Sequence, residues 1–204
     1  MIPLSVPNLS GNELKYVAKC IKTEWISTGG HYISVFEKKI ASYLKCKYAI
    51  ACINGTSALQ VALRLAGVSY GDEVIVPTLT FIAPVNAIIY NNAKPIFMDC
   101  DDYYNLDINK TIKFIKSETV FRNNFKFNKK TKKRIRAILP VHLWGNAARI
   151  DEVINICKDR NITIVEDSAE SFGTKYTKGK LKNKFTGTIG KMGCLSFNGN
   201  KILT

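Results

Sequence analysis

The stretch Ile162-Thr163-Ile164-Val165-Glu166-Asp167-Ser168-Ala169-Glu170 carries the strongest signal for the fold. It begins as an apolar, β-branched run without polar alternation, the pattern of a strand buried on both faces of a parallel sheet. Five other short runs resemble it, so the expected strands are residues 48–53, 73–77, 95–99, 135–141, 162–167 and 193–197. The sequence therefore predicts a mostly parallel sheet.

Segments with helical periodicity lie between and before these runs. They are residues 56–66, 82–91, 109–116 and 149–160. Nearer the start, Ser10-Gly11-Asn12-Glu13 has the pattern of a capping box that opens a helix reaching about Glu24. A second amphipathic helix places Val35, Phe36, Ile40, Tyr43 and Leu44 on one side. Strands that alternate with helices predict an α/β fold with helices covering the sheet.

Composition supports a folded chain with a substantial core. The 204 residues are 46% hydrophobic with a mean hydropathy of −0.04, and none of the apolar runs approaches the roughly 20 residues that span a bilayer. The start, Met1-Ile2-Pro3-Leu4, has no basic segment followed by an apolar one, so we expect no secretory signal and a cytoplasmic protein. Residues 121–136, the most polar stretch, are expected to form an exposed loop.

Cysteine and histidine usage argues against a metal site. The six cysteines include no C-x-x-C pair, and the chain has two histidines, His31 and His142. We interpret the cysteines as small buried apolar residues in a reducing compartment. The net charge of +14 raises the alternative of a nucleic-acid-binding module, centred on residues 126–136. That run contains no recognisable nucleic-acid-reading motif, so we do not expect nucleic acid as a partner.

Three segments that follow predicted strands hold candidate chemistry, because ligands of parallel sheets bind outside the carboxyl ends of the strands. The first is Asn54-Gly55-Thr56-Ser57-Ala58, where a glycine turn and hydroxyl residues open a helix. Free N–H groups and the helix dipole there favour a phosphate. Thr56 and Ser57 are equally compatible with ordinary N-capping.

The other two segments supply a carboxylate and an amine. Asp167 at a strand end is costly to desolvate, so it requires a metal, an arginine or a protonated heterocycle as partner, or else it caps a helix. Lys201 follows the last strand in Ser196-Phe197-Asn198-Gly199-Asn200-Lys201. There it is either a solvated charge or a partly desolvated amine suited to Schiff-base chemistry.

Together these segments resemble the DegT/DnrJ/StrS family of sugar aminotransferases, members of the fold-type I pyridoxal-phosphate enzymes. Besides the segments above, the resemblance rests on Gly71-Asp72-Glu73-Val74-Ile75-Val76-Pro77, Thr80-Phe81 and Pro140-Val141-His142-Leu143-Trp144-Gly145. The matching stretches cover essentially the whole chain. The resemblance implies a fold-type I large domain whose cofactor is pyridoxal 5′-phosphate.

By this resemblance, Lys201 forms the internal aldimine and shuttles a proton, and Asp167 pairs with the pyridine nitrogen. Thr56, Ser57 and Ser196 bind the phosphate. Phe81 stacks on the ring, and Glu170 lies near the ring hydroxyl, where relatives often have His or Gln and where a carboxylate would repel a phenolate. Thr28-Gly29-Gly30 and His31 either border the sugar site or form a plain loop.

The resemblance also implies the reaction and its partners. Glutamate donates an amino group to a nucleotide-linked 4-keto-6-deoxy sugar, with a UDP-linked N-acetyl sugar of legionaminic-acid-type pathways expected here, for amino-sugar and surface-glycan biosynthesis. Residues 1–204 correspond to the N-terminal segment and most of the large domain of a homodimer, with the small C-terminal domain missing. We therefore expect that this chain alone does not turn over. The alternative within the family is a non-catalytic fragment or a regulatory relative.

Overall fold

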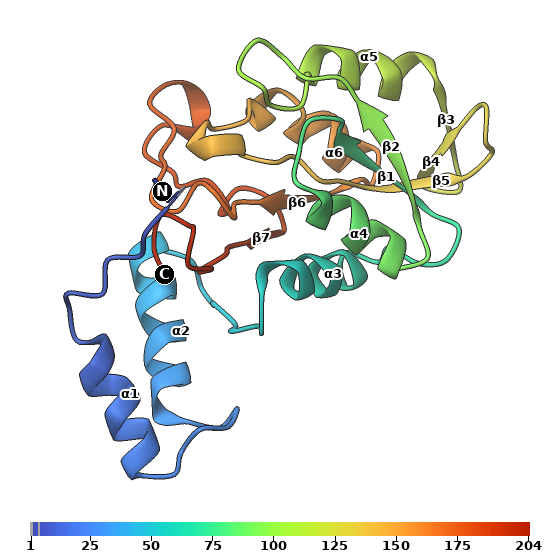
Figure 1. Ribbon diagram of the computed structural model, residues 1–204. Coiled ribbons are helices and arrows are strands. Elements are labelled where there is room, and N and C mark those ends of the chain that lie inside the picture. The colour runs from blue at the N-terminus through green and yellow to red at the C-terminus, as the bar shows by residue number, and fades with distance from the viewer. Residues whose placement is uncertain (1, 4) are drawn as a thin grey trace.

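The computed structural model describes residues 2, 3 and 5–204, built around a seven-stranded sheet (Figure 1). Parallel ladders join β2 (Lys94–Met98), β1 (Glu73–Pro77), β5 (Arg134–Ile138), β6 (Thr163–Asp167) and β7 (Met192–Cys194) in that spatial order. Because these strands run parallel, their carboxyl ends all lie at the same edge of the sheet. The predicted, mostly parallel sheet is confirmed.

Helices cover both faces of this sheet. On one face, α3 (Gly55–Leu65) and α4 (Ile82–Tyr90) pack in a cluster that includes Val74 and Val165. On the other face lie α5 (Ile108–Ser117), the 3₁₀ turn η2 (Ile150–Glu152) and α6 (Ile154–Asp159), packed in a cluster that includes Ile75 and Ile164. Successive strand residues alternate between the two clusters, as a doubly covered sheet requires.

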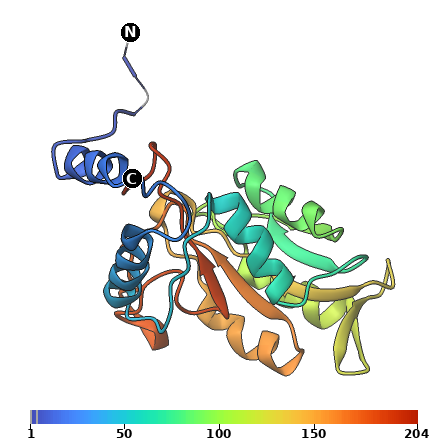
Figure 2. The ribbon, with the colours of Figure 1, turned by 90° about the horizontal axis from the view of Figure 1, so that it is seen from below.

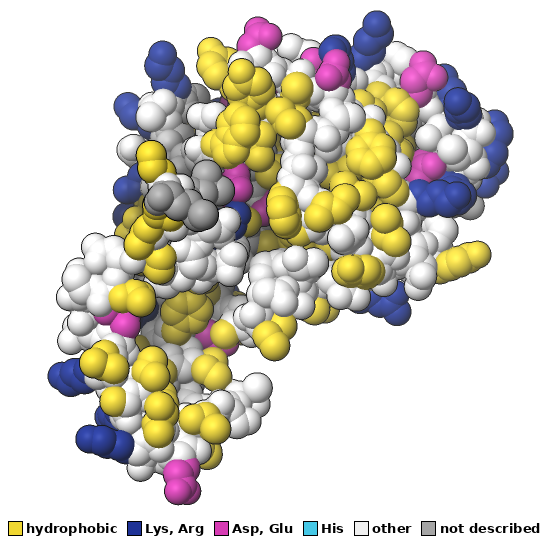
Figure 3. Space-filling view, in the orientation of Figure 1, with side chains coloured by type: hydrophobic (Ala, Val, Ile, Leu, Met, Phe, Trp, Pro, Cys, Tyr) yellow, Lys and Arg dark blue, Asp and Glu magenta, His cyan; other side chains and the backbone are white. Residues whose placement is uncertain are grey.

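The two N-terminal helices stand apart from the sheet (Figures 1 and 2). The longer one, α2 (His31–Leu44), is attached through Ile40 and Leu44, which pack with Phe185. The first, α1 (Glu13–Lys22), has no buried residue. Its apolar side chains contribute to the yellow area at the lower end of the molecule in Figure 3.

The predicted capping box is wrong. The helix begins at Glu13, with Asn12 at the N-cap position and no side-chain hydrogen bond that caps it. The Ser10 N–H instead donates to Asn8 Oδ1, so its turn closes before the helix starts. The expectation of no secretory signal falls partly on Met1 and Leu4, which lie outside the described residues.

The predicted strand at residues 48–53 is also wrong. The segment crosses from α2 to α3 without joining a ladder, and Tyr48, Ile50 and Ile53 are exposed. An apolar, β-branched run becomes a strand only when a neighbouring strand satisfies its backbone N–H and C=O groups. Elsewhere β5 and β7 are shorter than expected, and part of residues 149–160 is 3₁₀ rather than α-helix.

The expected loop at residues 121–136 is mostly a β-hairpin. β3 (Thr119–Arg122) and β4 (Phe125–Asn128) pair antiparallel, and β4 continues the ladder onto β5. The turn residues Asn123 and Asn124 have φ of 50° and 64°, as a two-residue primed turn requires. The guanidinium groups of Arg134 and Arg136 lie over the Phe125 ring in cation–π contacts, so these two cations of the run are not freely solvated.

Within the described part of the chain, no helix is long and apolar enough to cross a membrane. The same residues contain no group of three or more His, Cys, Asp or Glu side chains arranged to hold a metal ion.

Candidate functional site

The candidate site lies at the carboxyl edge of β6 and β7, where Lys201 meets Glu170. The Lys201 Nζ atom is 3.0 Å from Glu170 Oε1, and both side chains are more than two-thirds buried. Glu170 lies in the turn that follows β6, and Lys201 lies in the segment that follows β7. The second Glu170 oxygen, Oε2, accepts the Trp144 N–H at 3.0 Å. Two neighbouring strand ends therefore deliver the amine and hold it in place.

Asp167, the last residue of β6, is the buried carboxylate of this site. It is 5% exposed, and Oδ1 accepts the Ala169 N–H at 2.9 Å. No helix starts after it, so the alternative of a helix N-cap is wrong. Burial raises the pKa of Asp167 to about 6, the hydrogen bond from Ala169 and the Lys201 charge oppose the rise, and the Glu170 charge adds to it. Asp167 and Lys201 thus belong to one electrostatic cluster.

The parity of β6 decides which way its two acidic residues face. Asp167 shares its face with Val165, which packs in the cluster beneath α3, whereas Glu166 shares the opposite face with Ile164. Asp167 is therefore on the side of the sheet where α3 begins. The sequence placed both features at strand ends but could not assign the face.

The turn before α3 has the form expected of an anion site. Asn54 is the N-cap residue, and its Oδ1 accepts the Ser57 N–H at 2.8 Å, so neither the Thr56 nor the Ser57 hydroxyl serves as the cap. Among residues 5–204, the N–H groups of Gly55 and Thr56 find no acceptor. A Cβ atom on Gly55 would lie 3.3 Å from Ser196 Cβ and 3.5 Å from Ser196 Oγ. Ser196 therefore lies against the turn from which Thr56 and Ser57 begin α3.

Phe81 occupies the N-cap position of α4, a few residues beyond the end of β1. The residue is 72% exposed, which leaves its side chain accessible to a planar ligand. The preceding Thr80 has a buried Oγ1 atom that no described group hydrogen-bonds. By contrast, His31 begins α2 at the end that points away from the sheet (Figure 1), so the fold does not bring residues 28–31 to the cluster.

A model of the DegT/DnrJ/EryC1/StrS aminotransferase family matches residues 7–204. The chain belongs to this family. It is 42% identical to the GDP-perosamine synthase of Escherichia coli O157:H7 over all of this chain and 50% of that protein. It is 40% identical to the GDP-perosamine synthase of Caulobacter vibrioides, again over all of this chain and 49% of that protein. The chain thus spans about half the length of the curated relatives it matches.

Solved structures of the family have the same fold. The aminotransferase from Psychrobacter cryohalolentis superposes with a TM-score of 0.81 at 30% identity, over 99% of this chain and 47% of that one. The putative sugar aminotransferase Spr1654 from Streptococcus pneumoniae, in its PLP-form, gives a TM-score of 0.81 at 25% identity, over 100% of this chain and 50% of that one. The expected family and the fold-type I architecture are confirmed.

The residues of this DegT-family chain suit pyridoxal 5′-phosphate in their chemistry. Asp167 is a buried carboxylate that forms no ion pair with any described cation, which suits a protonated ring nitrogen. The free N–H groups at the start of α3 and the nearby hydroxyls suit a phosphate. Lys201 supplies the amine that an aldehyde requires.

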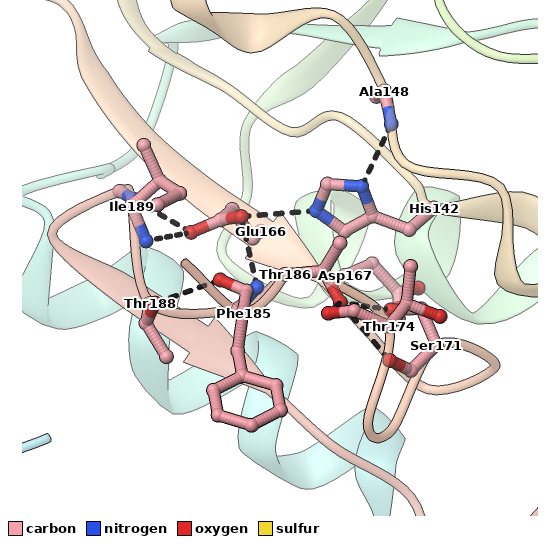
Figure 4. Close-up of polar contacts among 12 residues, drawn as sticks. His142, Ala148, Glu166, Asp167, Ser171, Thr174, Phe185, Thr186, Thr188 and Ile189 are labelled. Atoms are coloured by element: carbon pink, nitrogen blue, oxygen red, sulfur yellow. Dashed lines mark hydrogen bonds and ion pairs between the residues drawn. The ribbon is translucent and has the colours of Figure 1, made fainter. Parts of the chain in front are cut away.

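One buried pair at the site was not anticipated. Glu166 accepts a hydrogen bond from His142 Nε2 at 2.9 Å, and both side chains are fully buried (Figure 4). The hydrogen bonds from His142 and from the backbone lower the pKa of Glu166 against the rise that burial alone would cause. The signal available in the sequence was a second acidic residue inside an apolar strand, and no local pattern indicates its partner.

Proposed function

We propose that this chain carries the cofactor-binding part of a pyridoxal-phosphate-dependent sugar aminotransferase. The observation that carries the proposal is the Lys201–Glu170 pair, 3.0 Å long, beside the buried carboxylate of Asp167. A surface lysine would extend into water, whereas the Lys201 amine is held by Glu170 at the strand ends. Asp167, the other carboxylate of the site, forms no ion pair with a described cation. That combination is what a carbonyl-bearing, basic heterocycle requires.

Each residue has a defined role in this proposal. Lys201 holds the cofactor covalently and later carries a proton on Nζ to and from the substrate carbon. Asp167 keeps the ring nitrogen protonated. Thr56, Ser57 and Ser196 bind the phosphate, and Phe81 covers one face of the ring. When bound, the cofactor supplies the electron-accepting ring on which amino-group transfer depends.

Glu170 is best explained as a positioning residue for the lysine. A carboxylate beside a ring hydroxyl would repel the negative oxygen, but Oε1 of Glu170 is engaged by Lys201 and Oε2 by the Trp144 N–H. Both oxygens are therefore occupied by donors from the protein. We propose that Glu170 aims the amine and forms an ion pair with it before the cofactor binds.

The proposed substrates are an amino donor, with glutamate expected, and a nucleotide-linked keto sugar. The resemblance suggested a UDP-linked sugar, and one relative at 33% identity over 85% of this chain is named UDP-2-acetamido-2-deoxy-3-oxo-D-glucuronate aminotransferase. Three relatives named GDP-perosamine synthase are 38–42% identical over the whole chain. This order of similarity favours a GDP-linked 4-keto-6-deoxy sugar.

We propose further that residues 1–204 form the N-terminal segment and most of the large domain of a homodimer. The support is the length of the relatives, of which this chain matches about half. Substrate contacts and partner-subunit contacts would then come from outside these residues. On this proposal the isolated chain can bind the cofactor but does not complete a transamination cycle.

Reduction by borohydride tests the cofactor proposal directly. The chain is incubated with pyridoxal 5′-phosphate, reduced, digested and mapped by mass spectrometry, with Lys201→Ala and Lys191→Ala compared. Lys191 precedes β7 and forms no ion pair within the described residues, so its replacement is the matched control. The adduct should map to Lys201, disappear in the first variant and persist in the second. An adduct spread over many lysines would refute the proposal.

Substrate preference is tested separately. Apparent affinities of a GDP-linked and a UDP-linked 4-keto-6-deoxy sugar are compared by calorimetry on the cofactor-loaded protein extended to the length of its relatives. Tighter binding of the GDP compound is expected. Tighter binding of the UDP compound would restore the expectation drawn from the sequence.

A further inference from the structure

The carboxylate of Glu166 is saturated by hydrogen-bond donors. Oε2 accepts from His142 Nε2 and from the Gly187 N–H, each at 2.9 Å. Oε1 accepts from the N–H groups of Ile189 at 2.7 Å and Gly190 at 2.6 Å. Glu166 is 0% exposed, so water does not compete for these contacts. All four partners donate, which suits an ionised carboxylate and no other side chain of this size.

The hydrogen bond that His142 Nδ1 accepts shows that His142 Nε2 is the donor in the contact with Glu166. His142 Nδ1 accepts the Ala148 N–H at 3.0 Å (Figure 4). A ring nitrogen that accepts carries no proton, so the proton of the neutral ring lies on Nε2 and points at Glu166. The hydrogen bonds therefore run one way, from the Ala148 backbone through the imidazole to the carboxylate.

The same histidine also holds the backbone of Asp167. The His142 N–H donates to the Asp167 carbonyl oxygen at 3.0 Å, and the Asp167 N–H donates to the Pro140 carbonyl oxygen at 2.9 Å. His142 thus binds two consecutive residues of β6, one through its ring and one through its backbone. The two backbone bonds hold the peptide groups on either side of Asp167, one through its N–H and the other through its carbonyl oxygen. Because each peptide group is planar and rigid, the backbone of Asp167 has little freedom to rotate.

We propose that His142 and Glu166 are positioning residues that set the orientation of the Asp167 carboxyl toward the cofactor ring. This inference rests on the proposed function for its consequence, but its geometry is a property of the chain without cofactor. The pair ties three segments together: the end of β6, the segment after β5 and the turn of residues 187–190 that precedes β7. Loss of either side chain breaks the hydrogen bond between the His142 ring and Glu166 and leaves the backbone bonds of His142 and Pro140 as the remaining hold on Asp167.

Substitutions can separate positioning from general support. Glutamine at position 142 can still donate from its amide to Glu166, whereas leucine cannot. At position 166, glutamine places an amide N–H group against N–H donors whichever way it turns, so Glu166→Gln leaves donors unpaired. The matched control is Asn128→Leu, which removes a 3.0 Å hydrogen bond from Asn128 to the buried Glu73 in β1, on the side of the sheet bearing the hairpin.

The experiment measures three quantities on the full chain for wild type, His142→Leu, His142→Gln and Asn128→Leu. They are thermal stability, the pyridoxal-phosphate dissociation constant by fluorescence, and the ¹³C titration of the Asp167 carboxyl without cofactor. The charged and titratable groups around Asp167 are His142, Glu166, Glu170, Cys194 and Lys201. Of these groups, His142 alone differs among the variants, so the titration reports the removed contact.

His142→Leu should weaken cofactor binding roughly tenfold, the effect of one lost charge-assisted hydrogen bond, and should displace the Asp167 titration. His142→Gln should keep the cofactor dissociation constant within about threefold of wild type and leave the Asp167 titration where it is in wild type. Asn128→Leu should lower thermal stability without changing either quantity. Equal changes in affinity and titration for His142→Leu and Asn128→Leu would overturn the inference. If wild type binds no cofactor, the proposed function fails, and the Asp167 titration by itself decides the positioning claim.

Discussion

Replacing Asp167 with asparagine should stabilise the cofactor-free protein at neutral pH. The carboxyl is 5% exposed, and burial raises its pKa from the ordinary 3.8 to about 6. A raised pKa means that the folded protein holds this proton more tightly than the unfolded chain does. The contribution of this group to the unfolding free energy is therefore fully present below pH 4 and is lost as the pH rises through 6.

The size of the effect follows from the shift. A change of about two pKa units corresponds to about 3 kcal/mol at 1.36 kcal/mol per unit. Asparagine is isosteric, keeps an oxygen for the Ala169 N–H and cannot ionise, so it avoids this loss. For a chain of this length, about 3 kcal/mol corresponds to roughly 6–12 °C in the melting temperature.

The assay is urea unfolding of wild type and Asp167→Asn, without cofactor, between pH 4 and 8. The difference in unfolding free energy should be near zero at pH 4, grow between pH 4 and 6 and level off above pH 7. Other titrating groups are common to both proteins and cancel in the difference. A difference that stays flat across this range would refute the claim that Asp167 is a buried carboxylate without a cationic partner.

Three further substitutions test other parts of the structure. Asn54→Ala removes the cap of α3 and should lower the unfolding free energy by about 1 kcal/mol in urea denaturation. Leu63→Ala empties a fully buried position and should cost about 2–5 kcal/mol, whereas Leu65→Ala, at a 66% exposed position on the same helix, should have little effect. Gly55→Ala places a methyl group 3.3 Å from Ser196 Cβ and should weaken pyridoxal-phosphate binding by fluorescence without comparable loss of stability; unchanged affinity would separate this turn from the phosphate.

The sequence predicted well those strands whose side chains are buried on both faces of the sheet. The run from 73 to 77 is buried at every position, and its neighbours in the parallel sheet share that character. The rule that ligands gather at strand ends then located Asp167 and Lys201, which the structure places in one cluster. Neither step required knowledge of the loops.

The parts that failed were decided by partners that a local pattern does not contain. Residues 48–53 have the composition of a strand but no ladder partner among the described residues. In the hairpin, Phe125 and Phe127 alternate with polar residues as strands do, and Asn123-Asn124 is a turn signal, but the charge of the run favoured a loop interpretation. The bond between His142 and Glu166 joins residues 24 positions apart, and composition does not reveal such contacts.

Adjacent carboxylates at the end of β6 show how one strand can serve both stability and chemistry. Glu166 faces the side where the protein supplies four donors, so its charge is constant and holds the framework together. Asp167 faces the side of α3, where the protein supplies one backbone N–H and no ion pair, so its charge costs stability until a cation arrives. A cation that binds beside Asp167 would then restore the unfolding free energy that is lost when this buried carboxyl ionises, up to about 3 kcal/mol. Cofactor should accordingly raise the unfolding free energy more in wild type than in Asp167→Asn, with the gap widening above pH 6.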